Sequence, residues 1–205
     1  MRIRLFAGAA AAVALLALTA CRSAPNVAIY IGDAVITEQQ VTELVDGYNA
    51  IAPADRKVTR EVVVEYALGE QLCDRAAKAK GFTYQPRPAQ AQTPAFLAMA
   101  GRFEACLEAM PVSPASEAEM RALYEREVDE GRLSPDVKFD DVRASIEGNQ
   151  NLQRQLSWTR TLDEQAKAAD VVVNPRYAPP FGAANVVRTV QNRPIAPQQP
   201  QQPQQ

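Results

Sequence analysis

The chain has 205 residues, with 22 basic and 24 acidic side chains and a formal net charge of −2. It contains no histidine, which excludes Ser-His-Asp catalysis, Cys-His catalysis and histidine metal sites. The charge balance provides no basic field, so no nucleic-acid partner is expected. A metal or a cofactor is not expected either.

The first segment predicts export. Arg2 and Arg4 precede an apolar run that ends in Leu-Thr-Ala-Cys at Cys21. A charged start, a short apolar core and small residues are typical of a secretory signal, here residues 1–20. Leu-Thr-Ala-Cys resembles the bacterial lipobox, which implies lipidation of the Cys21 sulfur, for example with palmitate. The alternative is an ordinary signal peptide with an incidental cysteine.

Removal of the signal would leave 20 basic and 24 acidic residues, a net charge of −4. Acyl chains hold a protein at a membrane without a spanning helix, so we expect a lipid-anchored protein on the extracytoplasmic face of the cell membrane. Residues 21–26 are expected to form a tether, and residues 27–177 one domain of about 150 residues with a real core.

The domain is predicted to begin with a hairpin. Residues 27–31 and 34–36 are apolar runs separated by Gly32-Asp33, a turn signal. Thr37 and Gln40 form a capping box that begins a helix, and Pro53 lies in the segment that ends it.

Two longer helices are expected next. Thr59 is a candidate N-cap for a helix over residues 60–80, which Gly81 ends. A proline-containing loop over residues 82–93 leads to a helix over residues 94–110.

The two helices each carry one cysteine, Cys73 and Cys106. In an oxidising compartment the pair is a candidate disulfide between neighbouring helices. The alternative is two buried free thiols, because cysteine packs well as a small apolar residue.

The C-terminal half is predicted to return to the hairpin. Ser116 begins a capped helix that Gly131 ends, and one long amphipathic helix follows from Asp140, which Gly148 and Asn149 are expected to bend or weaken. The apolar strand at residues 171–173 needs a partner, and residues 27–31 are the natural one. The predicted fold class is therefore mostly α, with a small sheet formed by the N-terminal hairpin and the C-terminal strand.

Residues 178–205, rich in Pro and Gln, are expected to be disordered.

One group of aromatic and methionine side chains has two interpretations. It could line a groove for apolar peptide segments, because methionine and aromatics give adaptable contacts, or it could simply be the core. Trp158 falls off the apolar stripe of its helix, so partial exposure and capping of the core edge are both open. The peptide-binding candidates are Tyr66, Phe96, Met99, Phe103, Met110 and Trp158.

The acidic pairs of the sequence do not indicate a catalytic site. Glu117, Glu119 and Asp140-Asp141 stand at helix starts, where the helix dipole stabilises negative charge. Asp163-Glu164 fits a solvated helix face. No enzyme activity is expected.

Several motifs in order resemble the SurA/PrsA family of extracytoplasmic chaperones. They are VAIYIGDAVIT at 27–37, LGEQL at 68–72, AKG at 79–81, SEAEMRALYERE at 116–127, FDDVR at 139–143 and VNPRY at 173–177. The resemblance implies a split helical chaperone domain that offers apolar surface to unfolded or newly exported polypeptides. Many members insert a parvulin prolyl-isomerase domain where this chain has only residues 130–138, so isomerase activity is not implied.

Two binding functions follow as expectations. The first is a membrane-anchored, chaperone-like binder of unfolded or newly exported polypeptides without isomerase activity. The second is a lipoprotein scaffold for one specific envelope partner.

Overall fold

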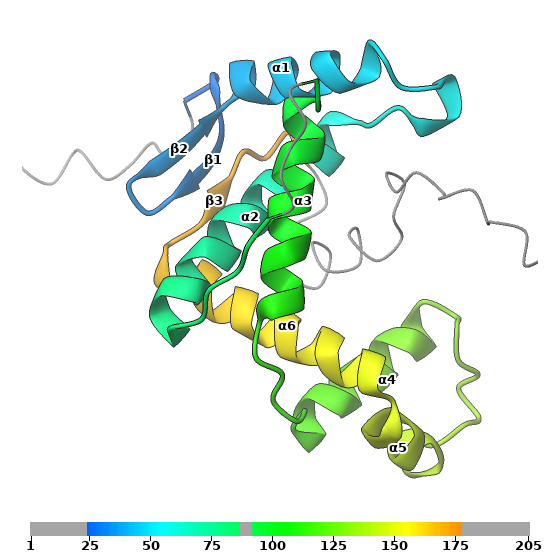
Figure 1. Ribbon diagram of the computed structural model, residues 1–205. Helices are drawn as coiled ribbons and strands as arrows, with labels where there is room; N and C mark the ends of the chain where they lie inside the picture. Colours follow the sequence, from blue (N-terminus) through cyan, green and yellow to red (C-terminus); the bar gives the residue numbers. More distant parts are fainter. Residues whose placement is uncertain (1–23, 87–91, 178–205) are drawn as a thin grey trace, which may run out of the picture.

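A computed structural model describes residues 24–86 and 92–177 (Figure 1). The predicted signal at residues 1–20, the lipidation site Cys21, residues 22 and 23 of the tether and the tail at residues 178–205 lie outside the described residues.

The two ends of the described chain meet in one antiparallel sheet. It contains β1 (Val27–Ile31), β2 (Ala34–Thr37) and β3 (Val172–Val173) in the order β2-β1-β3. Ile29 pairs with Val173, and Tyr30 pairs with Val172. The predicted pairing of the C-terminal strand with residues 27–31 is confirmed. β-Branched residues favour this extended, half-buried setting.

Asn174 extends the pairing of β3 beyond its two residues. Its backbone N–H donates to the Ala28 carbonyl at 2.9 Å, and its side-chain amide donates to the Val27 carbonyl at 2.8 Å. The short C-terminal strand is thus fixed by main-chain and side-chain hydrogen bonds together.

The hairpin turn requires glycine. Gly32 has a φ of 61° and donates its N–H to the Ala169 carbonyl at 2.6 Å. A Cβ at this position would lie 3.1 Å from the Arg75 guanidinium, so both the left-handed backbone and the close packing favour a residue without a side chain.

Helix α1 (Glu38–Asn49) starts at the predicted capping box of Thr37 and Gln40. A short 3-10 helix, η1 (Ala54–Arg56), follows. The Asn49 side chain donates to the Val58 carbonyl at 2.9 Å and accepts from the Val58 N–H at 2.8 Å. This amide closes the loop between α1 and the next helix.

Helix α2 (Arg60–Lys80) is the centre of the fold, packed against α1, α3 (Ala95–Ala109) and the C-terminal helix α6 (Gln150–Ala168) (Figure 1). The Thr59 hydroxyl accepts from the Val62 N–H at its start, and Gly81, with a φ of 70°, ends it. Both predicted ends are confirmed.

The predicted long C-terminal helix is wrong in one respect. It is two helices, α5 (Phe139–Gly148) and α6 (Gln150–Ala168), which follow α4 (Glu117–Asp129). At Asn149 the backbone leaves the helical region, with a ψ of 99°, and the side chain accepts from the N–H groups of Asn151 and Leu152. Asn149 therefore ends one helix and caps the next.

The apolar residues form two clusters that share α6. The main core lies between the sheet, α1, α2, α3 and α6. The smaller cluster contains Met120, Leu123, Phe139 and Ile146, with Leu152 and Leu156 of α6 packed against it. We call α4, α5 and the N-terminal half of α6 the arm, which projects from the main body at the lower end of Figure 1.

The segment that leads into the arm is fastened along α6. The Ser113 N–H donates to the Ser157 hydroxyl at 3.0 Å, and the Ala115 N–H donates to the Gln153 side chain at 2.8 Å. Ser157 is buried, and it also donates to the Pro111 carbonyl. These bonds satisfy polar groups that burial would otherwise leave without water.

Candidate functional site

Five of the predicted peptide-binding residues are interior residues. Tyr66, Phe96, Met99, Phe103 and Met110 are at most 5% exposed. The Tyr66 ring contacts the rings of Phe96 and Phe103 edge-on, at centroid distances of 5.5 and 6.1 Å. The groove interpretation is wrong for this group, because the stripes of α2 and α3 face each other and bury one another.

Trp158 is also buried, at 9% exposure, so of the two interpretations left open, partial exposure is wrong. It lies in the main core, although it falls off the apolar stripe of its helix. The reason is that α6 serves both clusters, so more than one of its faces is covered. Within residues 24–86 and 92–177 its indole Nε1 has no hydrogen-bond partner.

Cys73 and Cys106 form a disulfide that joins α2 to α3. Both residues are fully buried in the main core. The sequence left a disulfide and two free thiols open, and the structure contains the disulfide.

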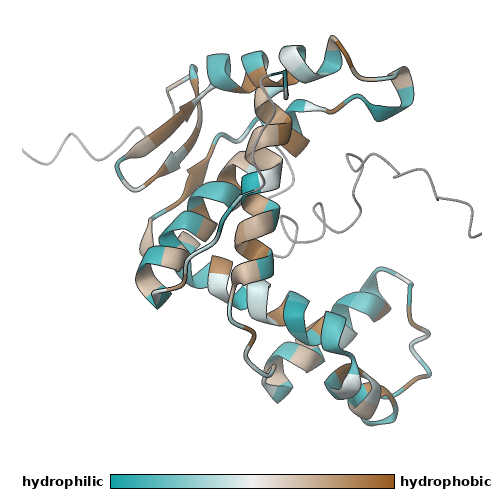
Figure 2. Cartoon of the chain, in the orientation of Figure 1, coloured by the Kyte–Doolittle hydropathy of each residue, from teal (hydrophilic) through white to brown (hydrophobic). Residues whose placement is uncertain are grey.

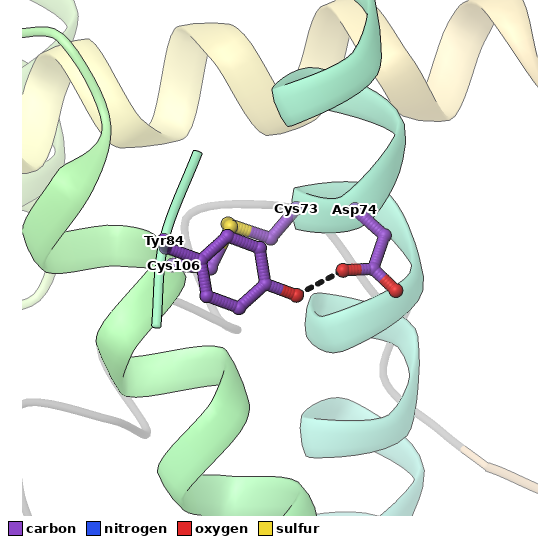
Figure 3. Close-up of a disulfide and its surroundings, with 4 residues drawn as sticks. All are labelled: Cys73, Asp74, Tyr84 and Cys106. Atoms are coloured by element: carbon purple, nitrogen blue, oxygen red, sulfur yellow. Dashed lines mark hydrogen bonds between the residues drawn. A yellow bond between two sulfur atoms is a disulfide. The ribbon is translucent and has the colours of Figure 1, made fainter. Parts of the chain in front are cut away.

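Tyr84 lies beside this covalent link. Its hydroxyl donates to the carboxylate of Asp74, the residue that follows Cys73 (Figure 3). Partial burial and this hydrogen bond raise the pKa of the Tyr84 hydroxyl well above its ordinary value.

An open groove of about 500 Å³ lies between α4 and α6. Its apolar residues are Ala122 and Leu123 of α4 and Leu156 of α6. Its polar lining consists of Glu119, Arg126, Thr159, Arg160, Asp163, Glu164 and Lys167. The hydropathy colouring in Figure 2 shows many hydrophilic residues along both helices.

Two ion pairs hold the helices of the groove, one between α4 and α6 and one between α2 and α6. Arg160 donates from one nitrogen to both carboxylate oxygens of Glu119 at 2.9 Å, and Lys80 pairs with Glu164 at 3.0 Å. Burial alone would raise the pKa of the Glu119 carboxyl, but hydrogen bonds from Ser116 and the charge of Arg160 outweigh it and lower that pKa. Glu119 is thus a structural carboxylate, engaged by a helix cap and an arginine.

Three further charges line the groove without such pairs. Arg126, Asp163 and Lys167 make no ion pair or side-chain hydrogen bond within the part of the chain that the structure describes. They are therefore the groove charges open to a bound partner. No sequence pattern indicated this site, because its residues come from two helices whose packing depends on the break at Asn149.

A second polar cluster lies where the C-terminal end of the described chain packs against α1 and α2. Glu38 accepts hydrogen bonds at Oε2 from Arg60 at 2.6 Å and from the Tyr177 hydroxyl at 2.7 Å. Arg176 lies 3.5 Å from Oε1 of the same carboxylate. Burial and the bond to Glu38 raise the pKa of the Tyr177 hydroxyl. We call Glu38, Arg60, Arg176 and Tyr177 the Glu38 cluster, and its contacts join both ends of the domain to α2.

Within the described ranges, no three cysteine or acidic side chains gather closely enough to hold a metal ion. None of the described helices combines the length and apolar character needed to cross a membrane. No protein-family model, curated protein or solved structure significantly matches this chain.

Proposed function

We propose that the protein is a lipid-anchored, extracytoplasmic, chaperone-like binder of unfolded or newly exported polypeptides, without isomerase activity. Cys21 would carry the lipid, and the short tether would keep the domain beside the membrane where exported chains emerge. The binding surface would be the groove between α4 and α6, in place of the buried residues that the sequence suggested.

The observation that carries this proposal is the character of the groove. It is an open groove of about 500 Å³ with apolar residues at Ala122, Leu123 and Leu156. Charges of both signs surround them, and Arg126, Asp163 and Lys167 are open to a partner. An unfolded polypeptide presents apolar side chains next to charges of either sign, which such a surface accepts without demanding one sequence.

The same groove also supports the second candidate, a scaffold for one specific envelope partner. The Glu119–Arg160 pair and the bonds from residues 113 and 115 to α6 fix the position of α4 before any partner binds. A preformed surface of this kind favours one complementary shape, because little ordering is left for binding.

Crosslinking in cells separates the two candidates. A photoreactive amino acid at Ala122 would lie in the groove, and one at Ala79, an exposed position of α2 outside it, is the matched control. Many different newly exported chains captured at position 122 alone would support the chaperone-like function. One stoichiometric product would support the scaffold, and equal capture at both positions would contradict the groove as the site.

Activity in solution provides a second test. The purified lipid-free domain is expected to suppress aggregation of a denatured model protein at near-stoichiometric amounts. It is expected to show no prolyl-isomerase turnover, because only residues 130–138 connect α4 to α5. Measurable turnover, or no suppression and no peptide binding, would contradict the proposal.

A further inference from the structure

The segment that follows α2 folds back onto the main core. Gly81 turns the chain, and the Phe82 N–H donates to the Ala77 carbonyl at 3.2 Å. Phe82 and Tyr84 are half-buried and pack against the cluster that contains both cysteines. The residues around them, Thr83, Gln85 and Pro86, are exposed.

One side chain fastens this segment. The Tyr84 hydroxyl donates to Asp74, which is adjacent to Cys73 in α2 (Figure 3). Among the described residues, this is the one hydrogen bond that residues 83–86 make. Such a segment, with little burial and one side-chain bond, belongs to the least stable part of a fold and opens locally.

The disulfide itself is buried. Cys73 and Cys106 are 0% exposed, between α2 and α3. A thiolate must approach one sulfur directly to attack the bond, so a buried disulfide reacts only after some part of the protein opens. The segment of Phe82 and Tyr84 packs against the core that holds both cysteines, and it can open without unfolding α2 or α3.

We propose that the hydrogen bond from Tyr84 to Asp74 is a latch that controls the access of thiol reductants to the Cys73–Cys106 disulfide. With the latch closed, residues 82–86 cover the disulfide. With the latch open, these residues lift away and a small dithiol reaches a sulfur atom while the helices stay folded.

The reaction is ordinary thiol–disulfide exchange. A thiolate of the dithiol bonds to one cysteine sulfur, the Cys73–Cys106 bond breaks, and the released cysteine thiolate takes up a proton. The second thiol of the reagent then displaces the first cysteine and closes a cyclic disulfide. Two electrons pass from the dithiol, which is oxidised, to the protein disulfide, which becomes two thiols.

The test measures the rate of reduction by dithiothreitol, with quenching by alkylation and detection by mass. Tyr84→Phe removes the donor and keeps the ring, and Asp74→Ala removes the acceptor. Because either change deletes a hydrogen bond to a charged group, we expect reduction about tenfold faster than in the wild type. Tyr124→Phe is the matched control, since Tyr124 donates its hydroxyl to the Val137 carbonyl in the arm, away from the disulfide.

The dependence of the rate on denaturant separates latch opening from global unfolding. Reduction through the latch is expected to be nearly independent of low denaturant concentrations, because local opening exposes little surface. Tyr84→Phe and Asp74→Ala should raise this flat part of the profile, and Tyr124→Phe should leave it unchanged. Wild-type rates in both latch variants, or a rate that rises steeply with denaturant from the lowest concentration, would overturn the proposal.

Discussion

The Tyr177 hydroxyl donates a 2.7 Å hydrogen bond to the carboxylate of Glu38, 139 positions earlier in the chain. The same oxygen accepts from Arg60 of α2 at 2.6 Å. Because β3 is only two residues long, the small sheet alone gives the C-terminal segment few bonds. The Glu38 cluster supplies the side-chain contacts that hold this segment to α1 and α2.

Removal of the Tyr177 hydroxyl is expected to weaken this closure. Tyr177→Phe deletes a hydrogen bond to a charged group and should lower the free energy of unfolding by about 1.5 to 3 kcal/mol. Chemical denaturation followed by the fluorescence of Trp158, the single tryptophan, measures it. Tyr30→Phe is the control, because the Tyr30 hydroxyl has no hydrogen bond to the rest of the described chain. Equal losses in both variants would contradict this role of the Glu38 cluster.

Stability should also fall at alkaline pH. Burial and hydrogen bonds to carboxylates raise the pKa values of Tyr84 and Tyr177 in the folded protein. Between the unfolded pKa of about 10 and these higher values, the folded state keeps protons that the unfolded state has lost, so the free energy of unfolding decreases as pH rises. The contribution is fully present below about pH 10.

The double variant Tyr84→Phe/Tyr177→Phe isolates this effect from the titration of lysines. Its free energy of unfolding is expected to be lower at neutral pH but to decline less than that of the wild type between about pH 9 and about pH 11. Parallel declines for the two proteins would show that neither hydroxyl keeps its proton more tightly when folded.

Reduction of the disulfide is expected to cost stability without abolishing the fold. The Cys73–Cys106 link spans 33 positions, which corresponds to about 3 to 4 kcal/mol in the chain-entropy model. Denaturation of the protein with and without a strong reductant should show this loss. The Cys73→Ala/Cys106→Ala pair should be insensitive to the reductant, and a reductant effect on it would point to another cause.

The helix break at Asn149 provides a fourth prediction. Asn149→Ala removes the side chain that accepts from the first N–H groups of α6 and should cost about 1 kcal/mol. Asn151→Ala is the control, since Asn151 is exposed and its side chain makes no hydrogen bond to the described residues. Unchanged stability in Asn149→Ala would mean that the cap contributes nothing to holding the arm.

A charge placed in the groove should abolish polypeptide binding. Ala122 is exposed and lines the groove, so Ala122→Arg fills the site while the buried residues of the arm stay in place. We expect loss of aggregation suppression with a free energy of unfolding within about 0.5 kcal/mol of the wild type. Ala79→Arg on α2 should retain full activity. Full activity in Ala122→Arg would exclude the groove as the binding surface.

Local sequence signals predicted most of the fold. The caps at Thr37, Thr59 and Ser116 and the stop at Gly81 set four helix ends, because each acts through its immediate neighbours. The return of the C-terminal valines to β1 was also predictable, since the chain offers few other strand partners.

The predictions that were wrong or missing concern features that depend on tertiary packing. The apolar periodicity runs through Asn149, so the stripe alone could not reveal that its side chain would cap a new helix. The exposure of Trp158 stayed open because an apolar stripe describes one buried face, whereas α6 is covered on more than one. The groove depends on the angle between α4 and α6, which no local pattern encodes.

The position of β3 also sets the order in which the protein can mature. β1 is made early, yet one of its two sheet partners leaves the ribosome about 140 residues later, which takes on the order of 10 s or more at about 5 to 20 residues per second. The whole segment from Cys73 to Cys106 is available well before then. The disulfide can therefore form in a chain whose sheet is still incomplete, and the domain becomes whole only when its last strand has been made.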